Sequence, residues 1–121
     1  MALIHDFGHV LIHVSDMDAA LSFYRDLLGF RVVGKANPVW TAVEVEGGQL
    51  TLWRVRDLVP LAMGPSGAGS PISLHVEDFE EVATVLEGKQ VRVRREDANS
   101  GVIWDPFGNV LRLHDHRGES E

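Results

Sequence analysis

The sequence predicts an α+β fold built from two tandem β-α-β-β-β modules. Three observations support this prediction. The chain begins with alternating apolar residues, an amphipathic helical pattern follows, and both return in the same order after a Pro-, Gly- and Ser-rich stretch. At 121 residues we expect one domain over 1–121, with module one at 5–58, a linker at 60–71 and module two at 72–116.

Module one begins with a strand that has two different faces, followed by a helix. Along the strand the two faces alternate, with Val10, Ile12 and Val14 against His9, Leu11 and His13. Ser15 or Asp16 is placed to cap the helix, and Gly29 stands at its C-terminal end. The apolar positions between these caps recur at helical spacing: Leu21, Tyr24, Leu27 and Leu28.

Three strands complete module one. They are predicted at "FRVVG" (30–34), "VWTAVEVE" (39–46) and "LTLWRV" (50–55). Gly47 and Gly48 separate the last two, as in a hairpin turn. The order of module one is therefore β-α-β-β-β.

Module two repeats module one. The stretch "ISLHVEDFEEVATVLEG" (72–88) follows the pattern of "VLIHVSDMDAALSFYRD" (10–26), so that Val14 and Asp16 return 62 positions later as Val76 and Asp78. The closing strand "LTLW" (50–53) is likewise matched by "LRLH" (111–114). Matching order, spacing and closing strands favour a duplication over a chance likeness of two strand-helix pairs.

Composition excludes several classes of function. The chain has no cysteine, so it has no disulfide, thiolate metal site or cysteine nucleophile. Its net charge of −7 disfavours binding to the phosphate backbone of nucleic acid, and no long apolar run suggests export or membrane insertion. We therefore expect a cytoplasmic protein with neither nucleic acid nor membrane as a partner.

Two stretches, "HVLIHVSDMDAALSFYRDLLGF" (9–30) and "WDPFGNVLRLHD" (104–115), resemble the vicinal oxygen chelate superfamily of glyoxalase I, bleomycin-resistance proteins, fosfomycin-resistance enzymes and extradiol dioxygenases. Asp105, Pro106 and Gly108 match the turn that precedes the last strand in that family. The resemblance implies that the modules form a curved, cup-shaped mixed sheet with the helices outside and the ligand inside. It also implies a homodimer in which modules of both chains combine.

The resemblance further implies four metal-ligand positions, which here are His9, Thr51, Pro71 and Arg112. Only His9 suits a divalent ion, because proline has no side-chain donor, threonine is a weak neutral one and arginine is a permanent cation. We therefore expect no metal and no cofactor, and the character of the metal-free bleomycin-resistance-like branch.

The other histidines suggest only a weak alternative for a metal. His9 and His13 lie about 13 Å apart on one strand, at roughly 3.3 Å per residue, and cannot share an ion. A pair drawn from His13, His75 and His114 remains an alternative. His5 and His116 are interpreted as parts of exposed ends with no function.

Strand parity predicts the lining of the ligand cup. The predicted lining includes the strand face that carries His9 and His13. Leu11 lies on the same face, and Trp40 is a candidate for the rim of the cup. Tryptophan offers stacking area and Arg or His offers directional donors, which suits a planar or polycyclic ligand. In the alternative reading the tryptophans fill the sheet interior and Arg112 pairs with Glu44 or Glu46. The predicted ligand-binding residues are His9, His13, Thr51, Trp53, Ser73, His75, Trp104, Arg112 and His114.

The sequence therefore predicts a metal-free small-molecule binding protein that sequesters an antibiotic or another planar or polycyclic compound. The first alternative is a glyoxalase-fold enzyme of lyase, isomerase or dioxygenase type, either metal-free or with non-standard ligands. In that case His13 and His75 are the candidate catalytic residues, as general bases. A second alternative is an accessory module whose cup serves only dimerisation.

Overall fold

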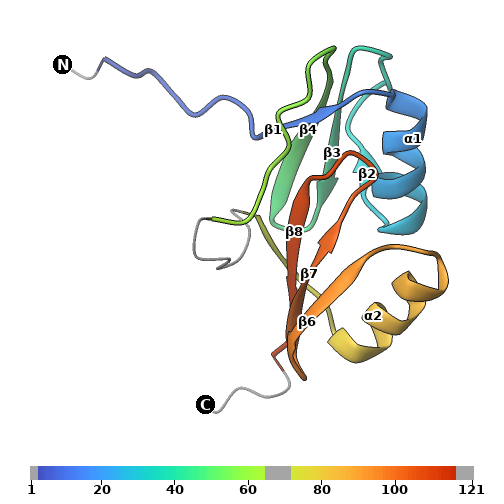
Figure 1. Cartoon of the computed structure of the whole chain (residues 1–121). Coiled ribbons are helices and arrows are strands. Elements are labelled where there is room, and N and C mark those ends of the chain that lie inside the picture. The colour runs from blue at the N-terminus through green and yellow to red at the C-terminus, as the bar shows by residue number, and fades with distance from the viewer. Residues whose placement is uncertain (1–2, 65–71, 117–121) are drawn as a thin grey trace. The chain divides into compact units, whose positions relative to one another are not determined.

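The computed structural model describes residues 3–64 and 72–116, and the chain divides into two compact units, Met1–Leu58 and Val59–Glu121 (Figure 1). Most of the predicted linker, 65–71, lies outside the described residues, as does Pro71. The described start of that stretch is held in place, because Leu61 donates its N–H to Asn109 Oδ1 and accepts from the Val110 N–H, both at 2.8 Å.

The first unit is a four-stranded mixed sheet with a helical segment on one face. Its strand order is β1-β4-β3-β2, and β1 and β4 are parallel whereas the other neighbours are antiparallel. A two-residue turn at Glu46 and Gly47 joins β3 to β4, one position earlier than the predicted Gly47 and Gly48, because Gly48 pairs with Val45 as the first residue of β4; Gly47 takes a positive φ of 89°. The strands are β1 (Leu11–Val14), β2 (Arg31–Val32), β3 (Trp40–Val45) and β4 (Gly48–Arg54).

The helical segment of the first unit is not a regular α-helix throughout. Helix α1 (Met17–Leu21) continues into a π-helix, η1 (Ser22–Leu27), in which the Leu28 N–H reaches back to the Phe23 carbonyl. Asp16 caps α1 by accepting from the Ala19 N–H at 3.1 Å. The predicted apolar stripe is partly wrong: Phe23 is buried beside Tyr24, while Leu27 and Leu28 are only half-buried. The wider π turn changes which residues face the sheet.

The second unit repeats this arrangement. Its strand order is β5-β8-β7-β6, with β5 parallel to β8 and the other neighbours antiparallel. Asp78 caps its helix by accepting from the Glu81 N–H at 3.2 Å, as Asp16 does in the first unit. The elements are β5 (Ser73–His75), α2 (Phe79–Gly88), β6 (Val93–Asp97), β7 (Ser100–Trp104) and β8 (Val110–His114). Two mixed sheets, each with its helix, confirm the predicted fold class.

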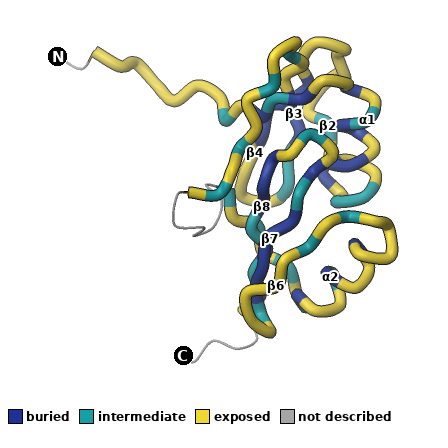
Figure 2. Tube along the Cα trace, in the orientation of Figure 1, coloured by how far each residue is buried: buried dark blue, intermediate teal, exposed yellow. Residues whose placement is uncertain are grey.

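Each unit has its own core between the sheet and its helix (Figure 2). In the second unit, Gly101 lies where β7 passes under α2. A Cβ at this position would come within 2.6 Å of Phe79 Cζ and 2.5 Å of the Arg94 carbonyl oxygen, so only glycine fits. Across residues 3–64 and 72–116, no helix has the length and apolar character needed to cross a membrane.

The turn from β7 into β8 is a buried hydrogen-bond network. One Asp105 carboxylate oxygen accepts from the N–H groups of Phe107 and Asn109, both at 2.8 Å, and the other accepts from the Asn109 side chain at 2.7 Å. Gly108 takes a φ of +87°. The motif that supported the family resemblance therefore has a structural role here.

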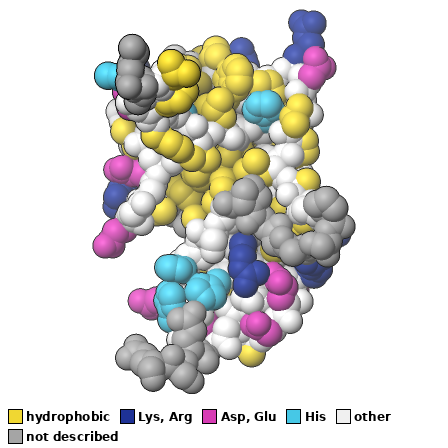
Figure 3. Space-filling view, turned by 90° about the vertical axis from the view of Figure 1, so that its left-hand side faces the viewer, with side chains coloured by type: hydrophobic (Ala, Val, Ile, Leu, Met, Phe, Trp, Pro, Cys, Tyr) yellow, Lys and Arg dark blue, Asp and Glu magenta, His cyan; other side chains and the backbone are white. Residues whose placement is uncertain are grey.

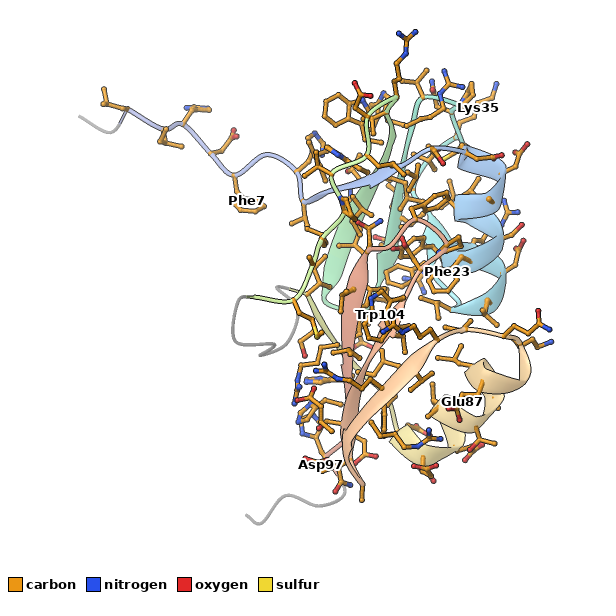
Figure 4. All side chains as sticks on the ribbon, viewed as in Figure 1. Phe7, Phe23, Lys35, Glu87, Asp97 and Trp104 are labelled. Atoms are coloured by element: carbon orange, nitrogen blue, oxygen red, sulfur yellow. The ribbon has the colours of Figure 1, made fainter. Side chains whose placement is uncertain are left out.

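Charged side chains join α2 to the neighbouring strand β6. Arg95 donates to Glu80 and Glu87 on α2, with the closest contacts at 2.9 and 2.7 Å. These bonds raise the pKa of Arg95 and lower the pKa of Glu87 below its ordinary range. At the end of β6 the backbone N–H of Asn99 lowers the pKa of Asp97. Glu87 and Asp97 are labelled in Figure 4.

Candidate functional site

The face of the first-unit sheet opposite the helix carries the histidines of the opening strand. Ile12 and Val14 are fully buried, and the residues that alternate with them, Leu11 and His13, are on the other face, where Leu11 is 42% exposed. His9 precedes the strand with the same parity and is exposed. Strand alternation therefore separates the core from an open face, as the sequence predicted.

A hollow of about 240 Å³ lies on this open face. The strand register explains its lining, because Leu11 pairs with Thr51 across β1 and β4, and Trp40 pairs with Trp53 across β3 and β4. His9 completes the lining. Figure 3 shows hydrophobic side chains gathered over one face of the first unit.

Each tryptophan of the hollow contacts a histidine edge-on. The rings of His9 and Trp40 are 5.8 Å apart, and those of His13 and Trp53 are 5.5 Å apart. Both indoles remain accessible, at 48% exposure for Trp40 and 40% for Trp53. The alternative in which these two residues fill the sheet interior does not hold, because a core side chain would be covered.

The inherited metal positions do not fit a divalent ion. In the first unit, His9 Nδ1 lies 3.3 Å from the hydroxyl of Thr51, so the two inherited positions of this unit supply one imidazole nitrogen and one neutral oxygen. In the second unit, Arg112 brings a guanidinium. A metal that needs three or four N, O or S donors has too few here.

The predicted site residues of the second unit also share one sheet face. The register pairs Ser73 with Arg112 and His75 with His114 across β5 and β8. Arg112 donates to Glu96 at 2.5 Å, so the alternative in which Arg112 pairs with Glu44 or Glu46 is wrong: its partner is a carboxylate on β6, which is separated from β8 by β7 in the same sheet. Whether these residues touch a ligand remains a prediction.

Trp104 lies at the end of β7 (Figure 4), and the residue is partly exposed. The guanidinium carbon of Arg92 is 3.9 Å from the ring centroid, a cation–π contact. The described hollow of the first unit does not include Trp104, so its predicted part in ligand binding stays a prediction.

Sequence reasoning gave His116 no role, yet the structure places it in a cluster. Its ring lies 4.4 Å from that of His75 and 4.9 Å from that of His114. The available signal was the spacing in "HDH" (114–116), since two histidines two positions apart share one face of an extended chain. The register that adds His75 was not visible in the sequence.

Comparison with known proteins identifies relatives over most of the chain. Residues 6–113 match the sequence profile of the family described as Glyoxalase/Bleomycin resistance protein/Dioxygenase superfamily. A catechol-2,3-dioxygenase of Bacillus subtilis is 30% identical over 110 residues, which is 85% of this chain and 38% of that protein. This chain thus spans about two fifths of the length of that relative.

Two further relatives have names connected with antibiotics or thiols. The metallothiol transferase FosB of Staphylococcus saprophyticus is 27% identical, over 93% of this chain and 78% of that protein. TnmS3, an antibiotic binding protein from Streptomyces sp. CB03234, has a solved structure that matches with a TM-score of 0.65 and 24% identity, over 95% of this chain and 98% of that one. At this identity the match to TnmS3 shows the fold alone.

Proposed function

Because the chain belongs to the Glyoxalase/Bleomycin resistance protein/Dioxygenase superfamily, we propose that it is a small-molecule binding protein. It holds a flat, largely apolar compound, such as an antibiotic, against Trp40 and Trp53. Binding needs no metal at the inherited positions, since their residues do not fit one. The observation that carries this proposal is the pair of half-exposed indoles around an apolar hollow.

The exposed indoles supply part of the binding energy. At 48% and 40% exposure, and with roughly 150–250 Å² for an aromatic side chain, they leave roughly 130–220 Å² in water. Covering this surface contributes about 3–5 kcal/mol at about 25 cal/mol per Å². A micromolar Kd corresponds to about 8 kcal/mol after the costs of association. A tight ligand therefore also needs polar contacts, which His9 and Thr51 offer, and further covering surface.

The size of the hollow points to a second source of surface. Its volume of about 240 Å³ is below the roughly 300–1,000 Å³ of a site for a drug-sized compound. We infer that a second copy of the chain covers the rest of a larger ligand in a homodimer. The N-terminal segment supports this, because Leu3, Ile4 and Phe7 are 94%, 79% and 82% exposed.

The homodimer is tested by light scattering on the intact chain and on a variant with Leu3, Ile4 and Phe7 changed to serine. The intact chain should have the mass of a dimer and the variant that of a monomer with unchanged circular dichroism. A monomeric intact chain at all concentrations would contradict the homodimer, and a dimeric variant would contradict the role of the segment.

The binding proposal is tested by a thermal-shift panel of bleomycin-type and planar aromatic natural products, measured in the presence of a chelator. A ligand should raise the Tm of the intact chain, and Trp53→Ala and Trp40→Ala should each weaken its binding at least about tenfold, which corresponds to 1.4 kcal/mol. Val85→Ala is the matched control, because Val85 is an exposed apolar residue on α2 of the second unit. No stabilisation by any compound, or equal loss in Val85→Ala, would refute the proposal.

The alternative is an enzyme of lyase, isomerase or dioxygenase type that uses non-standard ligands. One observation favours it, the histidine cluster of the second unit. Incubation of the chain with Fe²⁺ and catechol, followed by absorbance of a ring-cleavage product, tests the dioxygenase form. Sustained turnover that His75→Ala abolishes would favour the enzyme over binding alone.

A further inference from the structure

Three imidazoles meet on the open face of the second-unit sheet. His75 ends β5 and His114 ends β8, and the parallel register places these two residues side by side. His116 follows two positions later, and the ring centroids of the three residues are 4.4–5.2 Å apart. One ring nitrogen from each histidine lies within 4.8 Å of the others. Figure 3 shows histidine side chains gathered in one group on this unit.

Asp115, which lies between His114 and His116, holds the backbone of this segment in place. Asp115 is 1% exposed and turns to the opposite side, where it accepts from the Phe79 N–H at the start of α2 at 2.6 Å and from the Asn99 side chain at 2.7 Å. Its own N–H donates to the Asn99 carbonyl at 2.8 Å. This buried anchor extends the alternation of β8 by two residues, so both histidines stay on the open face.

The distances suit a metal ion after small side-chain rotations. In a tetrahedral site with metal–nitrogen bonds of about 2.0–2.1 Å, the nitrogens are roughly 3.3 Å apart. The three histidines are exposed or half-buried, so rotation of their side chains can bring the ring nitrogens from within 4.8 Å of one another to this shorter separation. Imidazole ligands favour Zn²⁺, Ni²⁺, Co²⁺ and Cu²⁺ over Mg²⁺ and Ca²⁺, which prefer oxygen.

The surroundings leave space for a further ligand. A hollow of about 510 Å³ is lined by His75, Val76, Glu77 and His116, and Glu77 has the same strand parity as His75. The nearby cation Arg112 is paired with Glu96. A fourth position, for water or the Glu77 carboxylate, is therefore open on this side.

We propose that His75, His114 and His116 bind one divalent transition-metal ion. None of the three occupies a position that the family resemblance marks as a ligand, so this site is separate from the inherited one. Its residues are also different from those that line the hollow at Trp40 and Trp53, and the proposal does not depend on the proposed binding function.

The test uses the full chain, made without an affinity tag and freed of metal with a chelator. After titration with Zn²⁺ or Co²⁺ and desalting, mass spectrometry of the metal should find one ion per chain, and Co²⁺ should give the visible absorption of a four- or five-coordinate site. Mg²⁺ should not compete. Substoichiometric Zn²⁺ and Co²⁺, or a six-coordinate Co²⁺ spectrum, would overturn the proposal.

Single substitutions assign the ligands. His75→Ala, His114→Ala and His116→Ala should each weaken Co²⁺ binding by more than the roughly 10–100-fold that loss of an outer-shell partner costs. His5→Ala, at a fully accessible histidine, is the control and should bind as the intact chain does. If His114→Ala fails to fold, the exposed positions carry the test as His75→Gln and His116→Gln. Equal binding by these variants and His5→Ala would overturn the assignment.

A negative result in the metal test and a negative result in the ligand panel can be told apart. The panel is run with a chelator, so an absent metal site leaves its result unchanged. Absent binding of aromatic compounds likewise leaves the metal stoichiometry unchanged.

Discussion

Asn109→Ala tests whether the turn before β8 holds the second unit together. Asn109 is completely buried, and its side chain donates to Asp105 at 2.7 Å and accepts from the Leu61 N–H at 2.8 Å. A hydrogen bond to a charged group is worth about 1.5–3 kcal/mol and one between neutral groups about 0.5–1.5 kcal/mol. Removal of both should lower the free energy of unfolding by about 2–4 kcal/mol, because the Asp105 oxygen and the Leu61 N–H lose their partner.

Urea unfolding followed by circular dichroism measures this loss. For a chain of this size we expect the Tm to fall by roughly 8–15 °C. Asn37→Ala is the matched control: its side chain accepts from the N–H groups of Val39 and Trp40 at an exposed turn, so its loss should stay below about 1 kcal/mol. A loss below about 1 kcal/mol in Asn109→Ala, or one equal to the control, would refute the structural role of the turn.

Two other predictions follow from the second unit. Gly101→Ala should destabilise the chain by about 1–3 kcal/mol or more in urea unfolding, because the new Cβ would meet Phe79 and the Arg94 carbonyl. Gly88→Ala is the control: a Cβ there has no other atom within 4 Å, so this change should be neutral or stabilising by up to about 1 kcal/mol. Arg95 lowers the pKa of Glu87, so the folded state gains stability above the ordinary range of glutamate and loses it as the pH falls through the folded pKa. Glu87→Gln should therefore reduce stability near pH 7, and its difference from the intact chain should shrink as the pH falls below the ordinary range of glutamate; a difference that does not change with pH would contradict this.

Local signals made much of the fold predictable. Asp16 and Asp78 cap their helices as the repeat of 62 positions implied, and Gly47 turns the hairpin between β3 and β4. The alternation around Ile12 and Val14 distinguished the core face of β1 from its open face. The same alternation in β4 places Trp53 on the open face. Each of these signals lies within a few residues of its effect.

Features that depend on distant pairing were not predictable. His116 meets His75 only because β5 runs parallel to β8 and because Asp115 anchors the chain beyond β8. Several carboxylates in the sequence could have paired with Arg112, and the strand order of β8, β7 and β6 brings Glu96 within hydrogen-bond distance of it. The π turn that buries Phe23 changed the helical period within the segment itself, which a fixed spacing of 3.6 does not anticipate.

The most direct test of the binding proposal is the NMR signal of the three indole N–H groups, assigned by Trp40→Phe, Trp53→Phe and Trp104→Phe. A compound that raises the Tm is added in the presence of a chelator. The signals of Trp40 and Trp53 should shift, because both rings line the hollow, and that of Trp104, stacked against Arg92, should shift less. A bound compound that moves only the Trp104 signal, or none of the three, would contradict the proposed site.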